Sequence, residues 1–174
     1  YYMLEKAGIR IPKMFSSPSK IDRPVIVKVA EAARGYERAF FIADSPKTFE
    51  QKVGELLSNG TITEEGLKKA VIEEYAIGAH VNFNYFYSPI DNELELMGTD
   101  TRRQTNLDGF LRLPADDQLE ALKIMKPKMV ETGHYAVTTK ESLLEKIFVM
   151  GEKFVKTTQK IHKPGIIGPF ALQG

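Results

Sequence analysis

The chain is 174 residues long, with 43% hydrophobic and 27% charged residues, which is typical of one ordinary globular domain. Its net charge of +1 argues against a polybasic nucleic-acid surface, so small ligands are the expected partners. The absence of cysteine excludes disulfides, thiolate catalysis and cysteine-ligated metals. Because no run of 18 apolar residues and no signal-peptide pattern occur, we expect a cytoplasmic location and no membrane partner.

Both ends of the chain predict flanking structure. Residues 1–8 have the pattern of the last turns of a helix closed by Gly8, without a helix start. Residues 166–174 have the pattern of a strand that needs a partner. We therefore expect this chain to be a piece of a larger enzyme.

The first half of the chain predicts a hairpin followed by helices. Strands are expected at 24–29 and 39–43, joined by a glycine-containing loop that is typical of an antiparallel hairpin. Ser45, followed by proline, predicts the start of an amphipathic helix. Thr61 and Glu64 have capping-box spacing and predict a second, short helix.

The second half predicts more strands, a short helix and a long one. Asp116 opens the short helix, and the capping-box pattern from Thr138 to Glu141 opens a long helix with a buried stripe that includes Leu143. The expected strands are residues 71–75, 81–87, 93–101 and 166–174. This order indicates an α+β fold with antiparallel hairpins, because a parallel sheet would alternate strands and helices regularly.

A lysine and two acids suggest a nucleotide pocket. Lys28 stands among β-branched residues, and it is either solvated or holds phosphate in a cleft. Arg34, in the loop after it, offers a guanidinium group to phosphates. Glu73 and Glu74 lie on opposite faces of their strand, where they are either a solvated strand end or a contact for adenine and ribose.

Polar residues in the second half extend the candidate site. His80, Asn82 and Asn84 share one face of a strand, and this face either meets water or lines a ligand cavity. Residues 100–109 predict a loop that either recognises phosphate or carboxylate groups or is solvated. His134 is a candidate proton carrier or ligand contact. The scattered histidines argue against zinc, so any metal is expected to be oxygen-bound, such as magnesium.

Many blocks of the chain, taken in order, match the pattern of one enzyme family. The blocks are residues 7–12, 25–28, 73–75, 85–89, 95–98, 106–109, 112–115, 117–120, 141–144 and 165–170. With them the chain resembles the archaeal formate-dependent AICAR ligase family, the 5-formaminoimidazole-4-carboxamide ribonucleotide synthetases. The resemblance implies an ATP-grasp fold, with two α+β subdomains around a nucleotide cleft. The smaller subdomain is expected at 1–75 and the larger at 76–174, and N- and C-terminal parts of the fold are expected to be missing.

The resemblance also implies a reaction. ATP and formate would give formyl phosphate, which the 5-amino group of AICAR attacks to form FAICAR, with release of ADP and phosphate, in purine (IMP) biosynthesis. The implied cofactor is Mg²⁺ or Mn²⁺, and the oligomeric state, including a homo-oligomer, stays open. The residues expected to bind ATP are Lys28, Arg34, Glu73, Glu74, Tyr75, Asn82 and Gln104; those expected to bind AICAR are Arg103 and His134; and the expected metal ligand is Gln173. No catalytic residue is assigned.

The chain departs from the family pattern at three places. Gln104 stands where the family has a glutamate that contacts ATP, and His134 stands where it has an asparagine that contacts AICAR. The phosphate loop at 30–37 lacks most of the family's glycines. Two alternatives therefore stay open: a related ATP-grasp ligase that joins another acid to another amine, and a nucleotide-binding protein without turnover.

Overall fold

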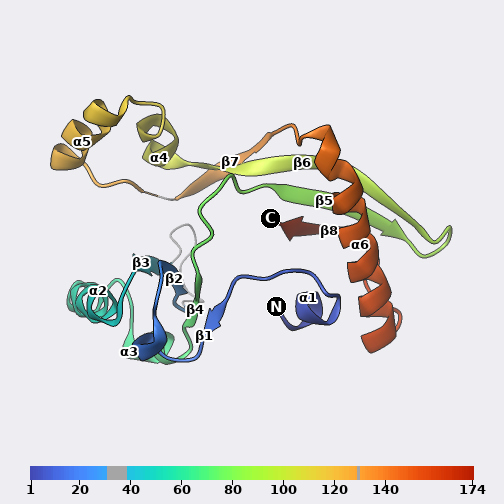
Figure 1. Cartoon of the computed structure of the whole chain (residues 1–174), viewed down its shortest axis with the longest axis horizontal. Helices are drawn as coiled ribbons and strands as arrows, with labels where there is room; N and C mark the ends of the chain where they lie inside the picture. Colours follow the sequence, from blue (N-terminus) through green and yellow to red (C-terminus); the bar gives the residue numbers. More distant parts are fainter. Residues whose placement is uncertain (31–38, 129) are drawn as a thin grey trace. The chain divides into compact units, whose positions relative to one another are not determined.

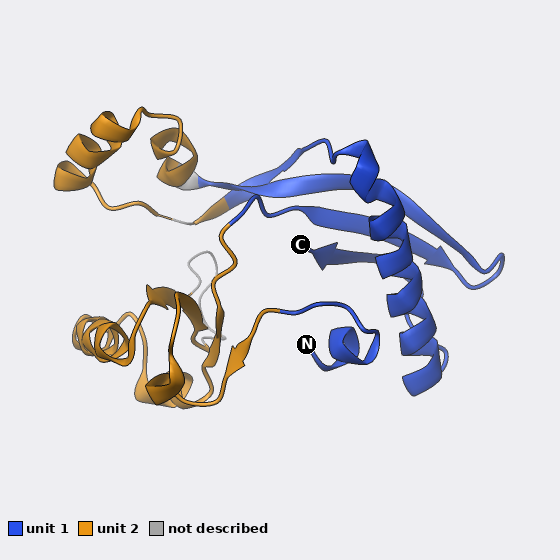
Figure 2. Ribbon diagram, in the orientation of Figure 1, with its two compact units in different colours: residues 1–11, 78–104, 132–174 blue, residues 12–77, 105–131 orange. Residues whose placement is uncertain are grey.

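The computed structural model describes residues 1–30, 39–128 and 130–174. In these residues the chain forms helices and antiparallel sheets, which confirms the predicted α+β class. Contacts group the chain into two compact units, each built from segments far apart in the sequence (Figure 2). Unit 1 consists of residues 1–11, 78–104 and 132–174, and unit 2 of residues 12–77 and 105–131. The subdomain boundary between residues 75 and 76 stays a prediction.

Figure 1 labels the elements along the chain. The helices are α1 (Tyr2–Lys6), the 3-10 helix η1 (Pro18–Lys20), α2 (Pro46–Ser58), α3 (Glu64–Lys68), α4 (Thr105–Phe110), α5 (Ala115–Ile124) and α6 (Glu141–Ile161). The strands are β1 (Met14–Phe15), β2 (Val25–Lys28), β3 (Phe40–Ala43), β4 (Val71–Glu74), β5 (Asn82–Ser88), β6 (Glu93–Gln104), β7 (Glu131–Ala136) and β8 (Gly168–Gln173). Within the described residues, no helix is long and apolar enough to cross a membrane.

The sheet of unit 2 has the strand order β1-β4-β2-β3 and packs one face against α2. β2 and β3 pair antiparallel, as predicted. Val25 and Val27 on β2 are completely buried, and burial of a valine side chain contributes about 1.5 to 3 kcal/mol. α2 begins after Ser45, as predicted, and a capping box that was not predicted closes its start: the Ser45 side chain accepts from the Thr48 backbone N–H, and the Thr48 hydroxyl accepts from the Ser45 N–H.

The N-cap of α3 differs from the prediction. Thr63 Oγ1 accepts a hydrogen bond from Gly66 N at 3.0 Å, so Thr63 caps the helix and Thr61 does not. The Thr61 N–H donates to Asn59 Oδ1 at 3.0 Å instead. Thr61 therefore still belongs to the turn that closes α2, and the helix starts two residues later than its capping-box spacing suggests.

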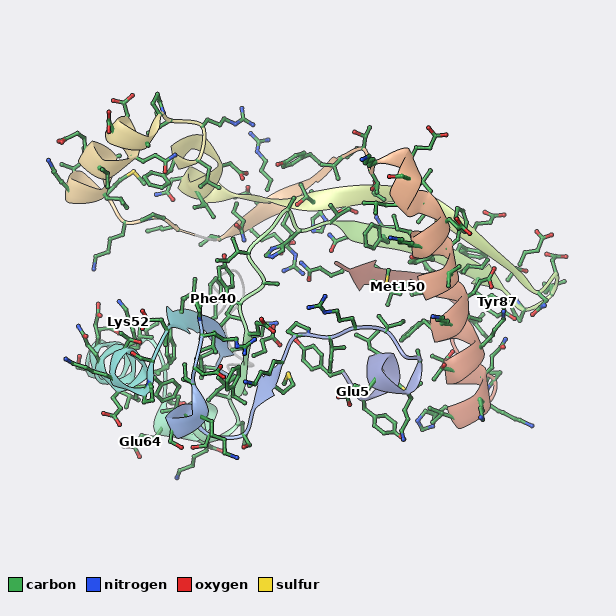
Figure 3. All side chains as sticks on the ribbon, in the orientation of Figure 1. Glu5, Phe40, Lys52, Glu64, Tyr87 and Met150 are labelled. Atoms are coloured by element: carbon green, nitrogen blue, oxygen red, sulfur yellow. The ribbon has the colours of Figure 1, made fainter. Side chains whose placement is uncertain are left out.

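The sheet of unit 1 has the strand order β7-β6-β5-β8, and α6 lies across one face of it (Figure 1). Tyr85 on β5 is completely buried there; its ring stacks on Phe170 with centroids 5.0 Å apart, and its hydroxyl donates to Ile147 O at 2.8 Å. Burial raises the pKa of Tyr85 to about 12. Met150 on α6, labelled in Figure 3, packs against this core.

Residues 100–109 are not a loop, so that prediction is wrong. β6 continues to Gln104, and α4 begins at the next residue. The strand is longer than predicted because β7 lies beside it and was not predicted. β7 is almost entirely exposed, so its sequence has no apolar alternation that would reveal a strand.

The start of α6 also differs from the prediction, although the helix itself is confirmed. Its N-cap is Lys140, without a side-chain cap, and the Thr139 hydroxyl donates to Thr99 Oγ1 at 3.3 Å on β6. Leu143, predicted to be buried, is 43% exposed. The buried stripe of the helix consists of Ile147, Gly151, Val155 and Thr158.

Candidate functional site

Lys28 and Glu73 form an ion pair in unit 2, with Lys28 Nζ donating to Glu73 Oε1. Both side chains leave the sheet on the face opposite to the buried Val27, because side chains alternate along β2 and Glu73 pairs with Ile26. The carboxylate side chain is only 6% exposed, whereas the lysine side chain is 48% exposed. A carboxylate this buried needs a cation beside it, and Lys28 provides it while its ammonium group still reaches solvent.

Apolar side chains surround this ion pair on the same face. The register places Met14 and Ile26 beside Glu73, Ile42 beside Ile26, and Phe40 beside Lys28. Met14 is 40% and Ile42 is 37% exposed, and Phe40 is labelled on β3 in Figure 3. An open apolar face with one ammonium group suits a flat aromatic ring that carries an anionic group.

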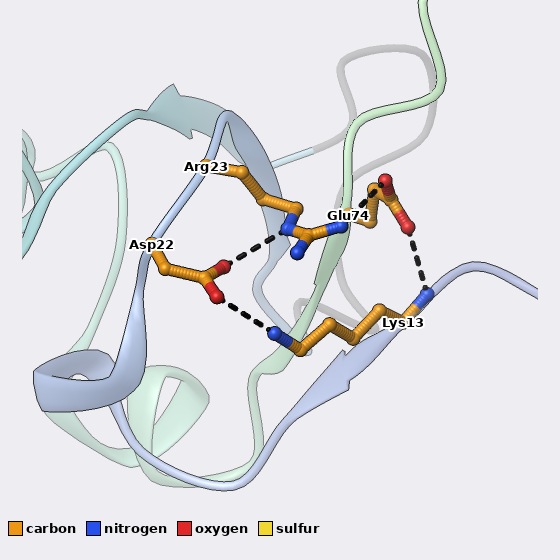
Figure 4. Close-up of polar contacts among 4 residues, drawn as sticks. All are labelled: Lys13, Asp22, Arg23 and Glu74. Carbon is orange, nitrogen blue, oxygen red and sulfur yellow. Dashed lines mark hydrogen bonds and ion pairs between the residues drawn. The ribbon is translucent and has the colours of Figure 1, made fainter.

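Glu74 belongs to a different set of contacts, shown in Figure 4. Its carboxylate accepts from Arg23 Nη1 and from the Lys13 backbone N–H, both at 3.3 Å. Asp22 accepts from Arg23 Nε and from Lys13 Nζ, both at 2.9 Å. Hydrogen bonds from Arg23 and then from Lys13 lower the pKa of Asp22 to about 2. Glu74 therefore links β4 to the segments before β1 and β2, whereas Glu73 pairs with Lys28.

Two further residues in this part of the chain, Tyr75 and Arg34, were expected to bind ATP. The Tyr75 backbone N–H donates to Pro24 O at 2.9 Å, which continues the pairing beyond β4. Arg34 and the other residues of the predicted phosphate loop from 31 to 37 lie outside the described residues. The ATP-binding roles of Lys28, Glu73 and Tyr75 likewise stay predictions.

In unit 1, Asp100 on β6 is the centre of a polar cluster. Its Oδ1 lies 2.8 Å from Asn82 Nδ2 and 2.6 Å from His134 Nδ1, and its Oδ2 lies 2.5 Å from Asn84 Nδ2. The hydrogen bonds from Asn82, His134 and Asn84 lower the pKa of Asp100 to about 2. We call these residues the Asp100 cluster.

The sheet register explains why these residues meet. Asn82 pairs with Asp100 on one side and with Gln173 on the other, so the three side chains leave the same face of the sheet. This face is the one opposite to α6, because Tyr85 on the alternate positions is buried against the helix. The predicted polar face is confirmed for Asn82 and Asn84, whereas His80 precedes β5. Asn82, His134 and Gln173 gather on one sheet. Asp100 was not among the predicted site residues.

The remaining two predicted residues lie farther along β6. Gln104 follows Asp100 by four positions, so strand alternation puts the two on the same face. Alternation turns the Arg103 side chain to the other face, and its carbonyl accepts from Thr132 Oγ1 at 3.1 Å. Their roles, like those of His134, Asn82 and Gln173, stay predictions.

A metal site is incomplete in this part of the chain. Among the described residues, no group of three or more histidines, aspartates and glutamates is placed to hold an ion. Gln173 offers one carbonyl oxygen, which is a suitable ligand for a hard cation but supplies no charge. The residues present therefore do not by themselves fit a magnesium site.

Known proteins resemble this chain over most of its length. A family model described as "Domain of unknown function (DUF1297)" matches residues 48–174. The chain belongs to this family. Two relatives, from Methanopyrus kandleri and Methanocaldococcus jannaschii, are each 44% identical to this chain over 171 residues. Both are named 5-formaminoimidazole-4-carboxamide-1-(beta)-D-ribofuranosyl 5'-monophosphate synthetase, which agrees with the predicted resemblance. The match covers 98% of this chain and 46% of each relative.

Two solved structures of purine-biosynthesis enzymes resemble this chain in fold. The IMP biosynthesis protein PurP from Thermococcus kodakaraensis is 28% identical with a TM-score of 0.63, over 99% of this chain and 46% of that one. Phosphoribosylamine--glycine ligase from Thermotoga maritima has the same TM-score at 17% identity, over 99% of this chain and 41% of that one. These similarities confirm the ATP-grasp fold and the predicted resemblance. The chain spans about half the length of the relatives it matches.

Proposed function

We propose that the full-length protein is a ligase that uses ATP and formate to formylate AICAR. The products are FAICAR, ADP and phosphate, with formyl phosphate as the intermediate. The observation that carries this proposal is the 44% identity, across 98% of this chain, to proteins named as synthetases of the same formylated ribonucleotide. Because the chain spans only 46% of those proteins, the activity is proposed for the full-length protein and not for these 174 residues.

The open face of the unit 2 sheet supports a role in holding ATP. In the proposal, Lys28 donates to phosphate oxygens, and Ile26 and Ile42 offer an apolar surface to the adenine ring. Glu73, 6% exposed, holds the lysine in place through their ion pair when no nucleotide is bound. Charge-assisted hydrogen bonds from an ammonium group to phosphate are stronger than hydrogen bonds between neutral groups.

The polar face of the unit 1 sheet supports a role in holding ligands and a metal, with Asn82 and Gln104 proposed to contact ATP and His134 proposed to contact AICAR. Asn82, Asn84 and His134 bring amide and imidazole groups together, and these discriminate ligands by hydrogen bonds rather than by charge. Gln173 would contribute one oxygen to Mg²⁺ or Mn²⁺, with ATP phosphates and residues outside this chain as the other ligands. When bound, the ion neutralises charge on the phosphates.

The proposed activity also implies the partners and the location of the protein. Small molecules are the proposed partners, without nucleic acid or membrane, and the proposed location is cytoplasmic. A homo-oligomer is compatible with the proposal, which does not depend on one.

The test is ADP release by the purified full-length protein with ATP and Mg²⁺. We expect ADP only when both formate and AICAR are present. Release with another carboxylic acid or another amine would instead support a related ATP-grasp ligase. Binding of ATP without any release of ADP would support a nucleotide-binding protein, and either result would overturn the formylation proposal.

A further inference from the structure

Helix α5, labelled in Figure 1, leaves its apolar side chains open. None of its residues, all of which the structure describes, is buried. Leu119 is 63% and Leu122 is 47% exposed, and Leu113, just before the helix, is 40% exposed. The helix has 10 residues, and isolated helices shorter than about 12 to 15 residues are only marginally stable in water. The apolar face of α5 therefore needs a partner surface.

This face carries opposite charges at its two ends. Asp116, Leu119 and Lys123 follow one another at spacings of three and four residues, which puts them in one row along the helix. All three side chains are exposed, and Leu122 lies beside the row. At a rise of 1.5 Å per residue, Asp116 and Lys123 lie about 10 Å apart along the helix axis, on either side of Leu119. A surface with an apolar centre between one carboxylate and one ammonium group is complementary to its own antiparallel copy.

A second copy of α5, packed antiparallel, matches the charges at both ends at once. A two-fold axis near Leu119 brings the two Leu119 side chains together and puts Asp116 of each copy beside Lys123 of the other. Parallel packing would instead bring like charges together. Lys123 Nζ donates to Glu120 Oε1 at 2.6 Å on its own helix, but both groups are mostly exposed. Because an ammonium group has three donors, Lys123 is able to serve a second carboxylate as well.

We propose that α5 is a self-association surface, through which two copies of the full-length protein pair antiparallel about Leu119. Leu119 and Leu122 form its apolar centre, and Asp116 and Lys123 set its direction. A stable interface usually buries about 800 Å² on each partner, so residues beside the helix, such as the exposed Leu113, extend the contact. The pairing uses none of the residues proposed to bind ATP, AICAR or a metal, so it does not depend on the proposed function.

The mass of the full-length protein in solution tests the surface. By analytical ultracentrifugation at micromolar concentration, we expect an even number of copies for the wild-type protein. We expect half that mass for Leu119→Glu, because two carboxylates would then face each other in the apolar centre. Ile90→Glu, a similar change at a residue that is 91% exposed between β5 and β6, is the control and should keep the wild-type mass. An odd number of copies in the wild-type protein, or an unchanged mass in Leu119→Glu, would overturn the inference.

Charge reversal tests the antiparallel direction. Asp116→Lys alone brings two ammonium groups together at each contact, and Lys123→Asp alone brings two carboxylates together. We expect each single variant to raise the dissociation constant of the pair roughly tenfold or more. The double variant Asp116→Lys/Lys123→Asp restores opposite charges across both contacts, and its dissociation constant should return to within about threefold of the wild-type value. A double variant that stays as weak as the single ones would overturn the antiparallel pairing.

The variant Asp117→Lys controls for effects on the helix itself. It makes the same change at the same end of α5, where acidic side chains favour the helix, but one position away from the row. We expect it to pair as the wild-type protein does. Weakening equal to that of Asp116→Lys would mean that the charge acts on the helix and not across an interface, and the inference would fail.

The outcomes separate this inference from the proposed function. If the wild-type protein shows no AICAR-dependent release of ADP, the proposed function fails, and the measured masses still decide whether α5 pairs. If Leu119→Glu does not fold, the charge-reversal series decides alone. If AICAR-dependent turnover is present in a monomeric protein, the function stands and the self-association surface fails.

Discussion

Asn82 on β5 lies directly opposite Asp100 on β6, and this pairing depends on one extra residue in β6. From the turn, Ser88 pairs with Glu93 and Tyr85 with Leu96, in regular register. The register then shifts, so that Asn84 pairs with Gly98 and Met97 is left over as a β-bulge. Without the bulge, Thr99 would face Asn82, and Asp100 would point to the α6 side of the sheet.

The bulge leads to a prediction for Gly98→Ala. Gly98 has φ of +153°, a conformation that L side chains rarely adopt, although nothing lies within 4 Å of an added Cβ. We expect a loss of about 1 to 3 kcal/mol in the free energy of unfolding, from backbone strain alone. Gly54→Ala is the control, because it lies within α2 with open space around it and should be neutral or stabilising. Urea denaturation measures both, and equal stability of the two variants would contradict the strain argument.

The bulge also shows why the sequence led to part of the site and not to Asp100. Alternation along β5 correctly put Asn82 and Asn84 on one polar face, because alternation is a property of a single strand. Placing Asp100 opposite Asn82 requires the register between strands, and a regular register counted from the turn puts Thr99 there. Apart from the glycine at position 98, no residue pattern in the sequence indicates the shift in register.

Contacts between distant segments explain the other differences. Thr138 was expected to cap α6, yet the helix begins after Lys140 without a side-chain cap. The Thr139 hydroxyl, between them, donates to Thr99 on β6, since tertiary partners compete with local caps. β7 was not predicted because its exposed positions follow no apolar alternation. By contrast, β2 and the start of α2 after Ser45 were predicted correctly, because local sequence is enough to specify them.

Gly151 on α6 gives a second prediction about packing. A Cβ added there would lie 2.6 Å from Tyr85 Cε1 and 2.9 Å from Leu94 Cδ2, closer than real contacts allow. Tyr85 is completely buried, and its hydroxyl donates to Ile147 O on the same helix, so its ring cannot move aside easily. We expect Gly151→Ala to cost about 1 to 3 kcal/mol despite the better helix propensity of alanine.

Thermal or urea unfolding of Gly151→Ala, beside Gly54→Ala, measures this effect. Both substitutions make the same chemical change within a helix, and only the first meets a buried ring. A stabilised Gly151→Ala would show that α6 shifts away from β5 at little cost.

Lys28 gives a prediction about nucleotide binding. We expect Lys28→Ala to weaken ATP binding by about 1 to 3 kcal/mol, the range for losing a charge-assisted hydrogen bond. Calorimetry with the full-length protein measures the affinity. Lys52→Ala, on the exposed side of α2 with a surface partner 3.4 Å away in Glu55, is the control and should bind ATP as the wild-type protein does. Unchanged affinity in Lys28→Ala would exclude Lys28 from the site.

The stability of the same variant needs a separate control. Lys28→Ala leaves the Glu73 carboxylate, 6% exposed, without this cation, so part of any loss of binding would come from a loosened sheet. Adding Glu73→Gln removes the buried charge, and we expect the double variant to recover stability but not ATP affinity. Recovery of both would mean that Lys28 stabilises the sheet and does not contact the nucleotide.

The low pKa of Asp100 predicts how its contribution to stability depends on pH. The folded-state pKa of about 2 lies below the ordinary 3.8, so the contribution is fully present above about pH 4 and is lost as the pH falls towards about 2. We therefore expect the titration of Asp100 itself to leave the difference in free energy of unfolding between the wild-type protein and Asp100→Leu unchanged above about pH 4. Below about pH 4 this difference should shrink, because both the folded and the unfolded wild-type protein then bind the proton.

Urea denaturation of both proteins along a pH series measures the difference directly and cancels the titration of the other carboxylates. A difference that stays constant down to about pH 2 would mean that the amide and imidazole donors do not hold this carboxylate in its ionised form.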